Sequence, residues 1–219
     1  MNRPLALFDC DGTLVDSQHS ICAAMVRAFD AARLTPPDRP TILSVVGLSL
    51  PHAMAKLLPD ADDAFHHHIA DQYRDAFRTM RTEGDVVEPL YDGIGDLLDR
   101  LSGQGWLLGV ATGKSDRGLA LCLTQHGIID RFVTLQTADR HPSKPNPAML
   151  MAAMAEADAA PETTVMIGDT TYDIDMAIDA GVRAIGVNWG YHSPAELLAA
   201  GATAVAVDSE DLGRHIGTP

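Results

Sequence analysis

The chain has 219 residues, 46% of them hydrophobic, and a formal net charge of −14. It is long enough to bury one sizeable core together with an added segment. The negative charge argues against nucleic acid or an anionic membrane as a partner, because no basic run is present to release counterions.

The ends and the cysteines point to a reducing compartment. No stretch approaches the roughly 18 apolar residues that cross a membrane. The apolar run over residues 4–8 ends at Asp9 and is too short for the core of a signal peptide. The cysteines Cys10, Cys22 and Cys122 have neither pairing nor metal-ligand spacing. We therefore expect a cytoplasmic protein, with Cys22 and Cys122 as small core residues of helices.

The first predicted elements are one strand and a helical block. Residues 5–8 have the pattern of a short buried strand. Apolar residues then recur at helical spacing, which predicts helices over residues 17–34, 40–46, 51–58 and 61–82. No convincing strand lies between residues 15 and 88. The three consecutive histidines of residues 66–68 cannot all face one point, so we expect a solvated face rather than a metal site.

After Pro89 the pattern alternates between helices and strands. The predicted helices are 93–103, 116–126, 146–157, 171–180 and 194–200, and the predicted strands are 106–111, 132–136, 163–167, 183–187 and 203–207. Strands such as "TVMIG" and "RAIGV" are apolar throughout, as a parallel sheet covered on both faces requires.

This alternation predicts an α/β protein with a Rossmann-like, doubly wound parallel sheet. Residues 1–14 and 89–219 would form the core, and residues 15–88 an all-helical domain inserted after the first strand. Ligands of such sheets bind outside the carboxyl ends of the strands.

Polar motifs follow several of the predicted strands and so fall at this edge. They are "DCDGT" with Asp9, Asp11 and Thr13, "ATGKS" with Thr112 and Gly113, "HPSKPNP" with Lys144, and "IGDTTYDID" with Asp169 and Asp173. Two aspartates at the end of a buried strand are costly unless something neutralises them, and no lysine or arginine is near in the sequence. A metal ion and a phosphate group would resolve this conflict.

The residue types suit phosphate chemistry. Asp9 could attack phosphorus or bind a metal, and Gly12 permits an abrupt turn after Asp11. Carboxylates and a backbone carbonyl are hard oxygen donors that suit Mg²⁺. Thr112 and Lys144 can donate hydrogen bonds and positive charge to phosphate oxygens, with backbone N–H groups beside them.

Each motif alone also fits an ordinary structural role. D-x-D-G occurs in calcium loops, although an EF-hand needs its glycine at the sixth position and a helix before it. Lys144 could be a solvated loop residue, Asp169 a helix N-cap and Asp173 an acidic residue in the first turn of a helix. The order of all four motifs and their position after strands favour a shared site.

Taken together, "DCDGT", "TGK", "SKPNP" and "GDTTYD" resemble the four motifs of the haloacid dehalogenase superfamily of phosphohydrolases. The helical block after "DGTLVDS" resembles the cap domain of its phosphoglycolate phosphatase-like branch. The resemblance spans nearly the whole chain. It implies a mobile helical cap over the core and Mg²⁺-dependent hydrolysis of a phosphate monoester.

The resemblance also implies residue roles. Asp9 would become an aspartyl-phosphate, and Asp11 would act as general acid and then as general base. Thr112, Gly113 and Lys144 would bind the phosphoryl group. Asp9, the Asp11 backbone carbonyl and Asp169 would hold Mg²⁺. Asp173, which orients Lys144 or a water molecule, and Thr13 would support this site.

The substrate is expected to be chosen by the cap. "VVGLSLPHA", residues 45–53, resembles the cap loop that reaches into the site, with Gly47 as its flexible point and Ser49 as a polar contact. The alternative is a connection between helices that only packs. Asp11 argues against a dehalogenase, which lacks it. Leu50 stands near the place where phosphonoacetaldehyde hydrolases have a cap lysine, which argues against cleavage of a C–P bond. This loop also shows no arginine that could hold the bisphosphate of a phosphoglucomutase-like enzyme.

We therefore expect a phosphatase that acts on a small phosphorylated metabolite, such as 2-phosphoglycolate. A pyrophosphatase, a nucleotidase or a sugar-phosphate phosphatase is the alternative on the same scaffold, and a non-catalytic phospholigand-binding protein is a remote one. Such a binding protein would be expected to lose Asp9, Asp11 or Lys144. A monomer and a homodimer both fit the sequence.

Overall fold

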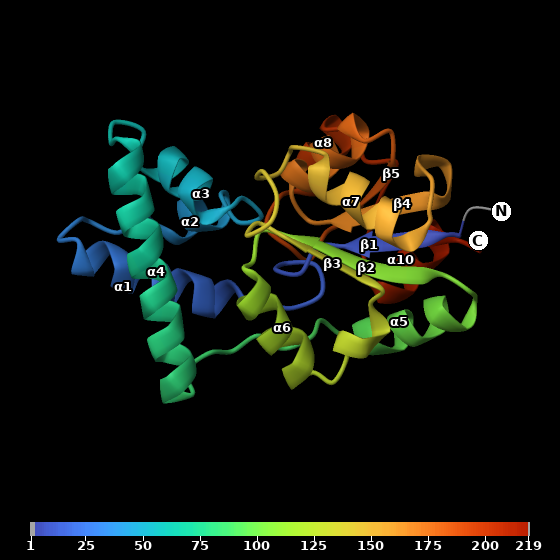
Figure 1. The fold of residues 1–219 in the computed structure, drawn as a ribbon, viewed down its shortest axis with the longest axis horizontal. Coiled ribbons are helices and arrows are strands. Elements are labelled where there is room, and N and C mark those ends of the chain that lie inside the picture. Colours follow the sequence, from blue (N-terminus) through green and yellow to red (C-terminus); the bar gives the residue numbers. More distant parts are fainter. Residues whose placement is uncertain (1–2, 219) are drawn as a thin grey trace.

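A computed structural model describes residues 3–218 and contains a parallel sheet with helices on both faces and four more helices beyond one end (Figure 1). The strands are β1 (Leu5–Phe8), β2 (Leu107–Thr112), β3 (Thr134–Thr137), β4 (Thr164–Gly168), β5 (Arg183–Val187) and β6 (Ala204–Ala206). The helices are α1 (Gln18–Ala31), α2 (Arg39–Leu43), α3 (Leu50–Leu57), α4 (Asp63–Glu83), α5 (Ile94–Gly103), α6 (Asp116–Gln125), α7 (Ala148–Ala157), α8 (Thr171–Asp179), α9 (Pro194–Ala199) and α10 (Ser209–Ile216). The predicted doubly wound α/β fold is confirmed.

The sheet has the strand order β3-β2-β1-β4-β5-β6, and every neighbouring pair is parallel. At the carboxyl end of β1, Phe8 pairs with Val110 of β2 and with Ile167 of β4. The loops that follow these three strands therefore begin side by side. The strand order reverses between β1 and β4, which is where ligands bind in sheets of this kind.

Side chains of the strands alternate between two apolar layers, because successive residues of a strand point to opposite faces. Ala6 and Phe8 belong to the layer under α5, α6 and α10, whereas Leu5 and Leu7 belong to the layer under α7, α8 and α9. All four are fully buried. Because both faces of β1 are covered, the residues that follow it also begin in a dry environment.

The helices α1 to α4, residues 18–83, form what we call the helical insert, which lies beyond the carboxyl ends of the strands (Figure 1). The insert has its own apolar cluster, built on Ile21, Met25, Phe29, Met54 and Ile69. Two segments of the chain connect the insert to the sheet, one before α1 and one after α4. They lie side by side, because the Asp16 N–H donates a hydrogen bond to the Pro89 carbonyl over 2.8 Å. Two adjacent connections of this kind are suited to a hinge.

The structure differs from the predicted elements in a few places. Residues 16–88 contain no strand, as expected, but α2 is shorter than predicted, and α10 was not predicted. The signals of α10 are an N-cap at Asp208 and buried Leu212 and Ile216 on one face. The reading of the histidine run as a solvated face is wrong for His66, which is buried and whose Nε2 lies 2.9 Å from the Leu58 carbonyl oxygen.

Candidate active site

The loop after β1 carries the two aspartates that open the site. Asp9 is 1% exposed, and its Oδ1 accepts a hydrogen bond of 2.6 Å from the Cys10 N–H. Gly12 has φ +83, and a Cβ at this position would overlap the Asp169 carboxylate. Only glycine adopts this backbone without strain while approaching a neighbouring strand so closely. The sharp turn therefore brings the loop against the end of β4.

Lys144 supplies the positive charge that the neighbouring sequence lacks. Its ammonium lies 3.1 Å from Asp9 Oδ1 and 2.5 Å from Asp173 Oδ1, and the side chain is fully buried. Burial alone would lower the pKa of Lys144, but Asp173 and Asp9 raise it above its ordinary value. The lysine is therefore held as a cation between two carboxylates.

Three carboxylates converge beside this lysine. Oxygen atoms of Asp9, Asp169 and Asp173 lie within 4.8 Å of one another. Asp9 Oδ2 is buried and accepts no hydrogen bond from any residue of 3–218, which leaves its lone pairs available. Both oxygens of Asp173 are engaged, Oδ1 by Lys144 and Oδ2 by the Thr170 N–H and hydroxyl. Asp9 and Asp169 are therefore the better placed of the three to bind a hard divalent cation.

The pKa values report the same excess of negative charge. The pKa of Asp9 is raised to about 7, first by burial and then by the charges of Asp173 and Asp11, against the opposing effect of Lys144. Burial, followed by Asp173 and Asp9, also raises the pKa of Asp169 well above its usual range. A divalent cation would reverse these shifts, because an adjacent opposite charge favours the ionised carboxyl group.

Asp169 is held in place by two neighbours. The Thr13 hydroxyl donates to Asp169 Oδ1 over 2.8 Å, and the Tyr191 N–H donates to Oδ2 over 3.0 Å. Gly190 lies so close that a Cβ there would overlap Asp169. Thr13 therefore lies where the sequence predicted a supporting residue, whereas the loop after β5 was not anticipated.

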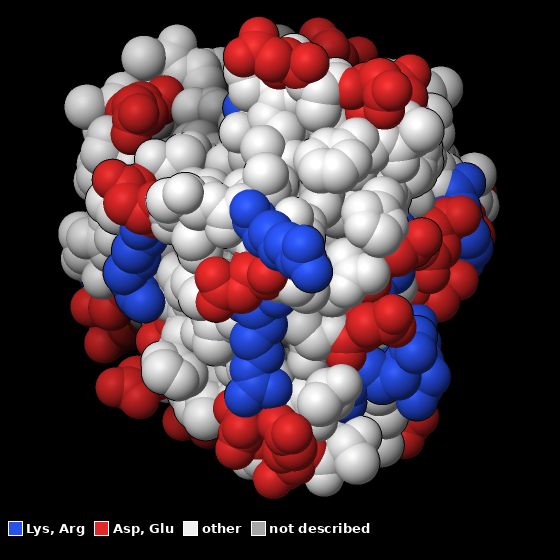
Figure 2. Space-filling view, turned by 90° about the vertical axis from the view of Figure 1, so that its left-hand side faces the viewer, with Lys and Arg blue, Asp and Glu red and all other residues white. Residues whose placement is uncertain are grey.

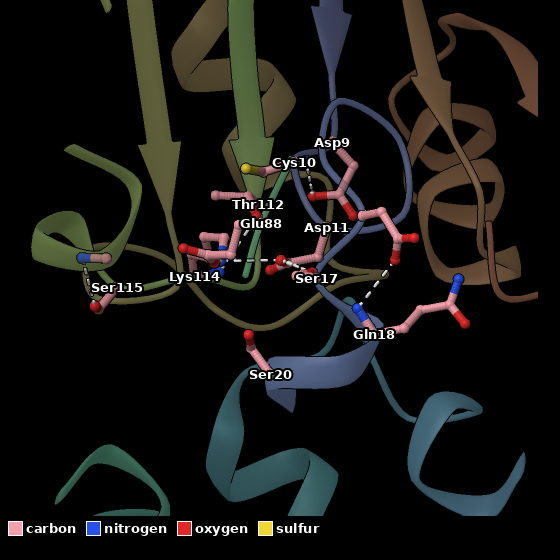
Figure 3. A network of polar contacts seen from close by, with 12 residues as sticks. Asp9, Cys10, Asp11, Ser17, Gln18, Ser20, Glu88, Thr112, Lys114 and Ser115 are labelled. Carbon is pink, nitrogen blue, oxygen red and sulfur yellow. Dashed lines mark hydrogen bonds and ion pairs between the residues drawn. The ribbon is translucent and has the colours of Figure 1, made fainter. Parts of the chain in front are cut away.

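The Asp11 side chain belongs to a second network of polar contacts, with Ser17, Lys114 and Glu88 (Figure 3). Its Oδ1 accepts a hydrogen bond from the Ser17 hydroxyl and lies 2.9 Å from the ammonium of Lys114. Lys114 also contacts Glu88 Oε1 over 2.7 Å, and Arg81 contacts Glu88 Oε2 over 2.6 Å. Glu88 lies in the connection between the helical insert and the sheet, so Asp11 is linked by charge to that connection.

The charges of this network stabilise one another. Burial lowers the pKa of Lys114, but Asp11 and Glu88 more than reverse this and raise it well above its ordinary value. Burial raises the pKa of Glu88, but Lys114 and Arg81 overcome this and lower it. Glu88 and Ser17 were not predicted from the sequence, and Lys114 was noted only as part of its motif. No local spacing links these residues.

Thr112 and Gly113 lie at the end of β2, facing the helical insert. Both line the cavity that contains Asp9 and Asp11. A Cβ on Gly113 would approach the carbonyl oxygens of Gly47 and Leu48 to 2.7 Å, so the insert rests directly on this turn. Gly47 has φ +96 and also lines the cavity.

Ser49 is placed differently from Gly47. Its N–H donates to the Ser143 hydroxyl over 2.9 Å, and its own hydroxyl lies 2.9 Å from His52 Nδ1. It is absent from the residues that line the cavity. The structure thus uses Ser49 to join the insert to the loop before Lys144, which is the packing alternative that the sequence left open.

The fold and the site together define a class of α/β enzyme that handles anionic groups at the carboxyl edge of a parallel sheet. The chain belongs to the haloacid dehalogenase-like hydrolase family, whose match covers residues 6–187. The resemblance found in the four motifs is thereby confirmed.

Relatives of this chain carry phosphatase names. It is 37% identical over 202 residues to the probable phosphatase IndB of Dickeya dadantii (strain 3937). This match covers 90% of this chain and 86% of that protein. It is 30% identical over 195 residues to a phosphoglycolate phosphatase of Pseudomonas putida, covering 86% of this chain and 70% of that protein. The crystal structure of a predicted phosphatase from Clostridium acetobutylicum is similar, with TM-score 0.89, 27% identity and 99% of both chains covered. The chain is a phosphatase of this family.

Proposed function

We propose that this enzyme hydrolyses phosphate monoesters of a small metabolite through an aspartyl-phosphate on Asp9, with Mg²⁺ as cofactor. The observation that carries the proposal is Asp9 itself. It is buried, one of its oxygens has no hydrogen bond from the part of the chain that the structure describes, and Lys144 lies 3.1 Å from the other oxygen. A buried carboxylate held beside a cation and left partly unpaired is arranged to react, because a purely structural carboxylate would be fully paired.

The donor set fits Mg²⁺. Asp9 and Asp169 would hold the ion, with the Asp11 backbone carbonyl as a further ligand, and Thr13 and Tyr191 keep Asp169 in position. When bound, Mg²⁺ would neutralise the charge that builds up on the phosphoryl oxygens.

The residues of the chain would carry out two steps. In the first, an Asp9 oxygen forms a bond to phosphorus, the bond from phosphorus to the ester oxygen breaks, and Asp11 gives its proton to the leaving alcohol. In the second, water attacks phosphorus, Asp11 takes its proton, and phosphate leaves from Asp9. Thr112, the Gly113 N–H and Lys144 would hold the phosphoryl oxygens in both steps.

We further propose that residues 15–88 act as a cap that closes over the substrate. Support comes from the separate apolar cluster of the insert and its paired connections. Gly47 would flex with this motion, whereas Ser49 would hold the closed position through Ser143.

The surface supports a small-molecule substrate. Seen from the side of the helical insert, basic and acidic side chains are interspersed, so this face offers no continuous positive surface to a nucleic acid (Figure 2). Within residues 3–218 no helix is both long and apolar enough to cross a membrane. All three cysteines are free, which agrees with a cytoplasmic location. Sedimentation velocity would distinguish a monomer from a homodimer.

The test is phosphate release with Mg²⁺ over a panel of phosphorylated metabolites. The panel includes 2-phosphoglycolate, sugar phosphates, nucleotides and pyrophosphate, each with and without a chelator. Asp9→Asn should remove all turnover, whereas Asp130→Asn, an exposed aspartate outside the site, should not. Substantial activity in Asp9→Asn would contradict the nucleophile assignment. Absence of turnover in the wild type would favour a binding protein.

A further inference from the structure

A cavity of about 400 Å³ lies between the helical insert and the core, directly over the proposed catalytic residues. Asp9, Asp11 and Thr112 form its floor, and the rest of its lining comes from α1, α4, the segment 42–53 and residues 113–121. A cavity of this size holds a drug-sized ligand. It is therefore much larger than a phosphate group with a two-carbon tail requires.

The walls of this cavity are mostly apolar. The helical insert contributes Ile21, Met25, Leu50 and Phe77, and the core contributes Leu121. Phe77 belongs to the same face of α4 as Tyr73, with ring centroids 5.9 Å apart. The alcohol part of a bound phosphate ester would lie against these walls, because its phosphate must reach Asp9.

Most polar side chains of the lining are already engaged within the protein. Lys114 is shared by Asp11 and Glu88, so another anionic group on the floor would find no unpaired lysine there. Arg81 pairs with Glu88, and the Ser115 hydroxyl caps α6 by accepting from the Gly118 N–H. Carboxylate or hydroxyl groups of a substrate would lose water here and regain few hydrogen bonds, which is costly.

The remaining arginines of the lining, Arg74 and Arg78, pair with Asp71 and Asp75 at the exposed rim. Besides the Asp9 and Thr112 side chains of the floor, the walls offer Tyr73 and Arg117. Within residues 3–218, the Tyr73 hydroxyl makes no hydrogen bond and the exposed Arg117 makes no ion pair. These groups can accommodate one acceptor in the cavity and one at its rim, rather than the many hydroxyls of a sugar.

We propose that the preferred substrates are phosphate monoesters whose alcohol has a bulky, mainly apolar body, and that two-carbon phosphocarboxylates are poor substrates. This inference rests on the proposed function, since it concerns the group that leaves when Asp9 is phosphorylated. Burial of each additional methylene group of the alcohol should improve kcat/KM about fourfold until the cavity is filled.

The experiment uses primary alkyl phosphates from ethyl to pentyl, because their leaving groups have similar chemistry and differ in apolar length. With Mg²⁺, kcat/KM should rise about 60-fold over the series. Propyl phosphate should be hydrolysed better than 2-phosphoglycolate, which is similar in size. A flat series, or a preference for 2-phosphoglycolate, would overturn the inference.

Two variants of the cavity wall test whether this cavity causes the dependence of kcat/KM on alkyl length. Phe77→Asp places a charge in the cavity wall, and Leu121→Asp does so at a residue that is 40% exposed and so tolerates the change in folding. Both should flatten the dependence on alkyl length. Val26→Asp is the matched control, because Val26 is 38% exposed on α1 and does not line the cavity. Unchanged dependence in both cavity variants would refute this site.

Failure of the inference can be distinguished from failure of the proposed function. Acetyl phosphate is included as a small, reactive substrate that does not depend on the cavity walls. If the enzyme hydrolyses it with Mg²⁺ but shows no dependence on alkyl length, the hydrolase mechanism stands and the inference fails. If neither acetyl phosphate nor any alkyl phosphate is hydrolysed, the proposed function itself fails.

Discussion

Replacing Lys144 by methionine tests whether the buried lysine holds the carboxylates of the site together. Its ammonium lies 3.1 Å from Asp9 and 2.5 Å from Asp173. At an effective dielectric constant of about 20, these contacts correspond to attractions of about 5 and about 7 kcal/mol. Desolvation of the buried ammonium offsets several kcal/mol of this attraction. Lys144→Met should therefore lower the free energy of unfolding of the metal-free protein by about 3–5 kcal/mol.

The destabilisation caused by Lys144→Met should depend on pH, and its sign follows from the carboxyl group of Asp9, which is left without its cation. Without Lys144 the pKa of Asp9 in the folded protein rises further above that of the unfolded chain, because Lys144 is the charge that lowers it. The folded variant then binds a proton that the unfolded chain has released, so its stability falls as pH rises. One additional proton makes the deficit grow by about 1.4 kcal/mol per pH unit. Between pH 6 and pH 8 the deficit should therefore increase by about 2–3 kcal/mol.

The assay is urea unfolding at pH 6 and pH 8 with a chelator present, followed by the fluorescence of Trp106 and Trp189. Lys56→Met is the control, because Lys56 is exposed and, among residues 3–218, its ammonium has a polar contact with the Tyr172 side chain alone. The control should change the free energy of unfolding by about 0.5 kcal/mol or less. A deficit under about 1 kcal/mol for Lys144→Met at pH 8, or a larger deficit at pH 6, would refute the reasoning.

Three further predictions concern residues around this site. Asp11→Asn should slow departure of the alcohol and let phosphoenzyme accumulate, which acid-quench mass spectrometry would detect; an unchanged rate would remove its acid–base role. Glu88 has a lowered pKa, so its contribution to stability is present above its ordinary pKa of 4.5 and is lost as pH falls. The difference in unfolding free energy between wild type and Glu88→Gln should therefore be largest at pH 7 and shrink towards pH 3.5, and a constant difference would argue against the ion pair with Lys114. Gly12→Ala should cost about 2 kcal/mol or more in thermal unfolding and reduce turnover, because it strains a positive φ and meets Asp169; a neutral variant would contradict the close approach.

The sequence by itself determined the sheet, the order of its motifs and the edge that carries them. Continuous apolar strands such as residues 164–168 can only be buried on both faces, and parallel strands place their carboxyl ends together. Asp9, Lys144 and Asp169 could therefore be assigned to one site without coordinates. Their types also indicated the chemistry, because an aspartate at a buried strand end needs a cation.

Only the tertiary structure decided which charges pair. Lys114 contacts Glu88 across 26 residues of chain, and Lys144 contacts Asp173 across 29, and no periodicity links such positions. The sequence around Ser49 fits a substrate contact as well as a packing contact. In the fold its backbone N–H donates to Ser143 and its hydroxyl contacts His52.

The residues that line the cavity could not be predicted from the sequence either. Tyr73 and Phe77 recur at helical spacing, which predicts an apolar face but not what covers it. In the fold, Ile69 of that face is buried in the cluster of the insert, whereas Tyr73 and Phe77 pack against the edge of that cluster and also line the space above Asp9 and Asp11. Periodicity fixes the face of a helix, but the placement of the insert against the core decides whether that face packs or binds.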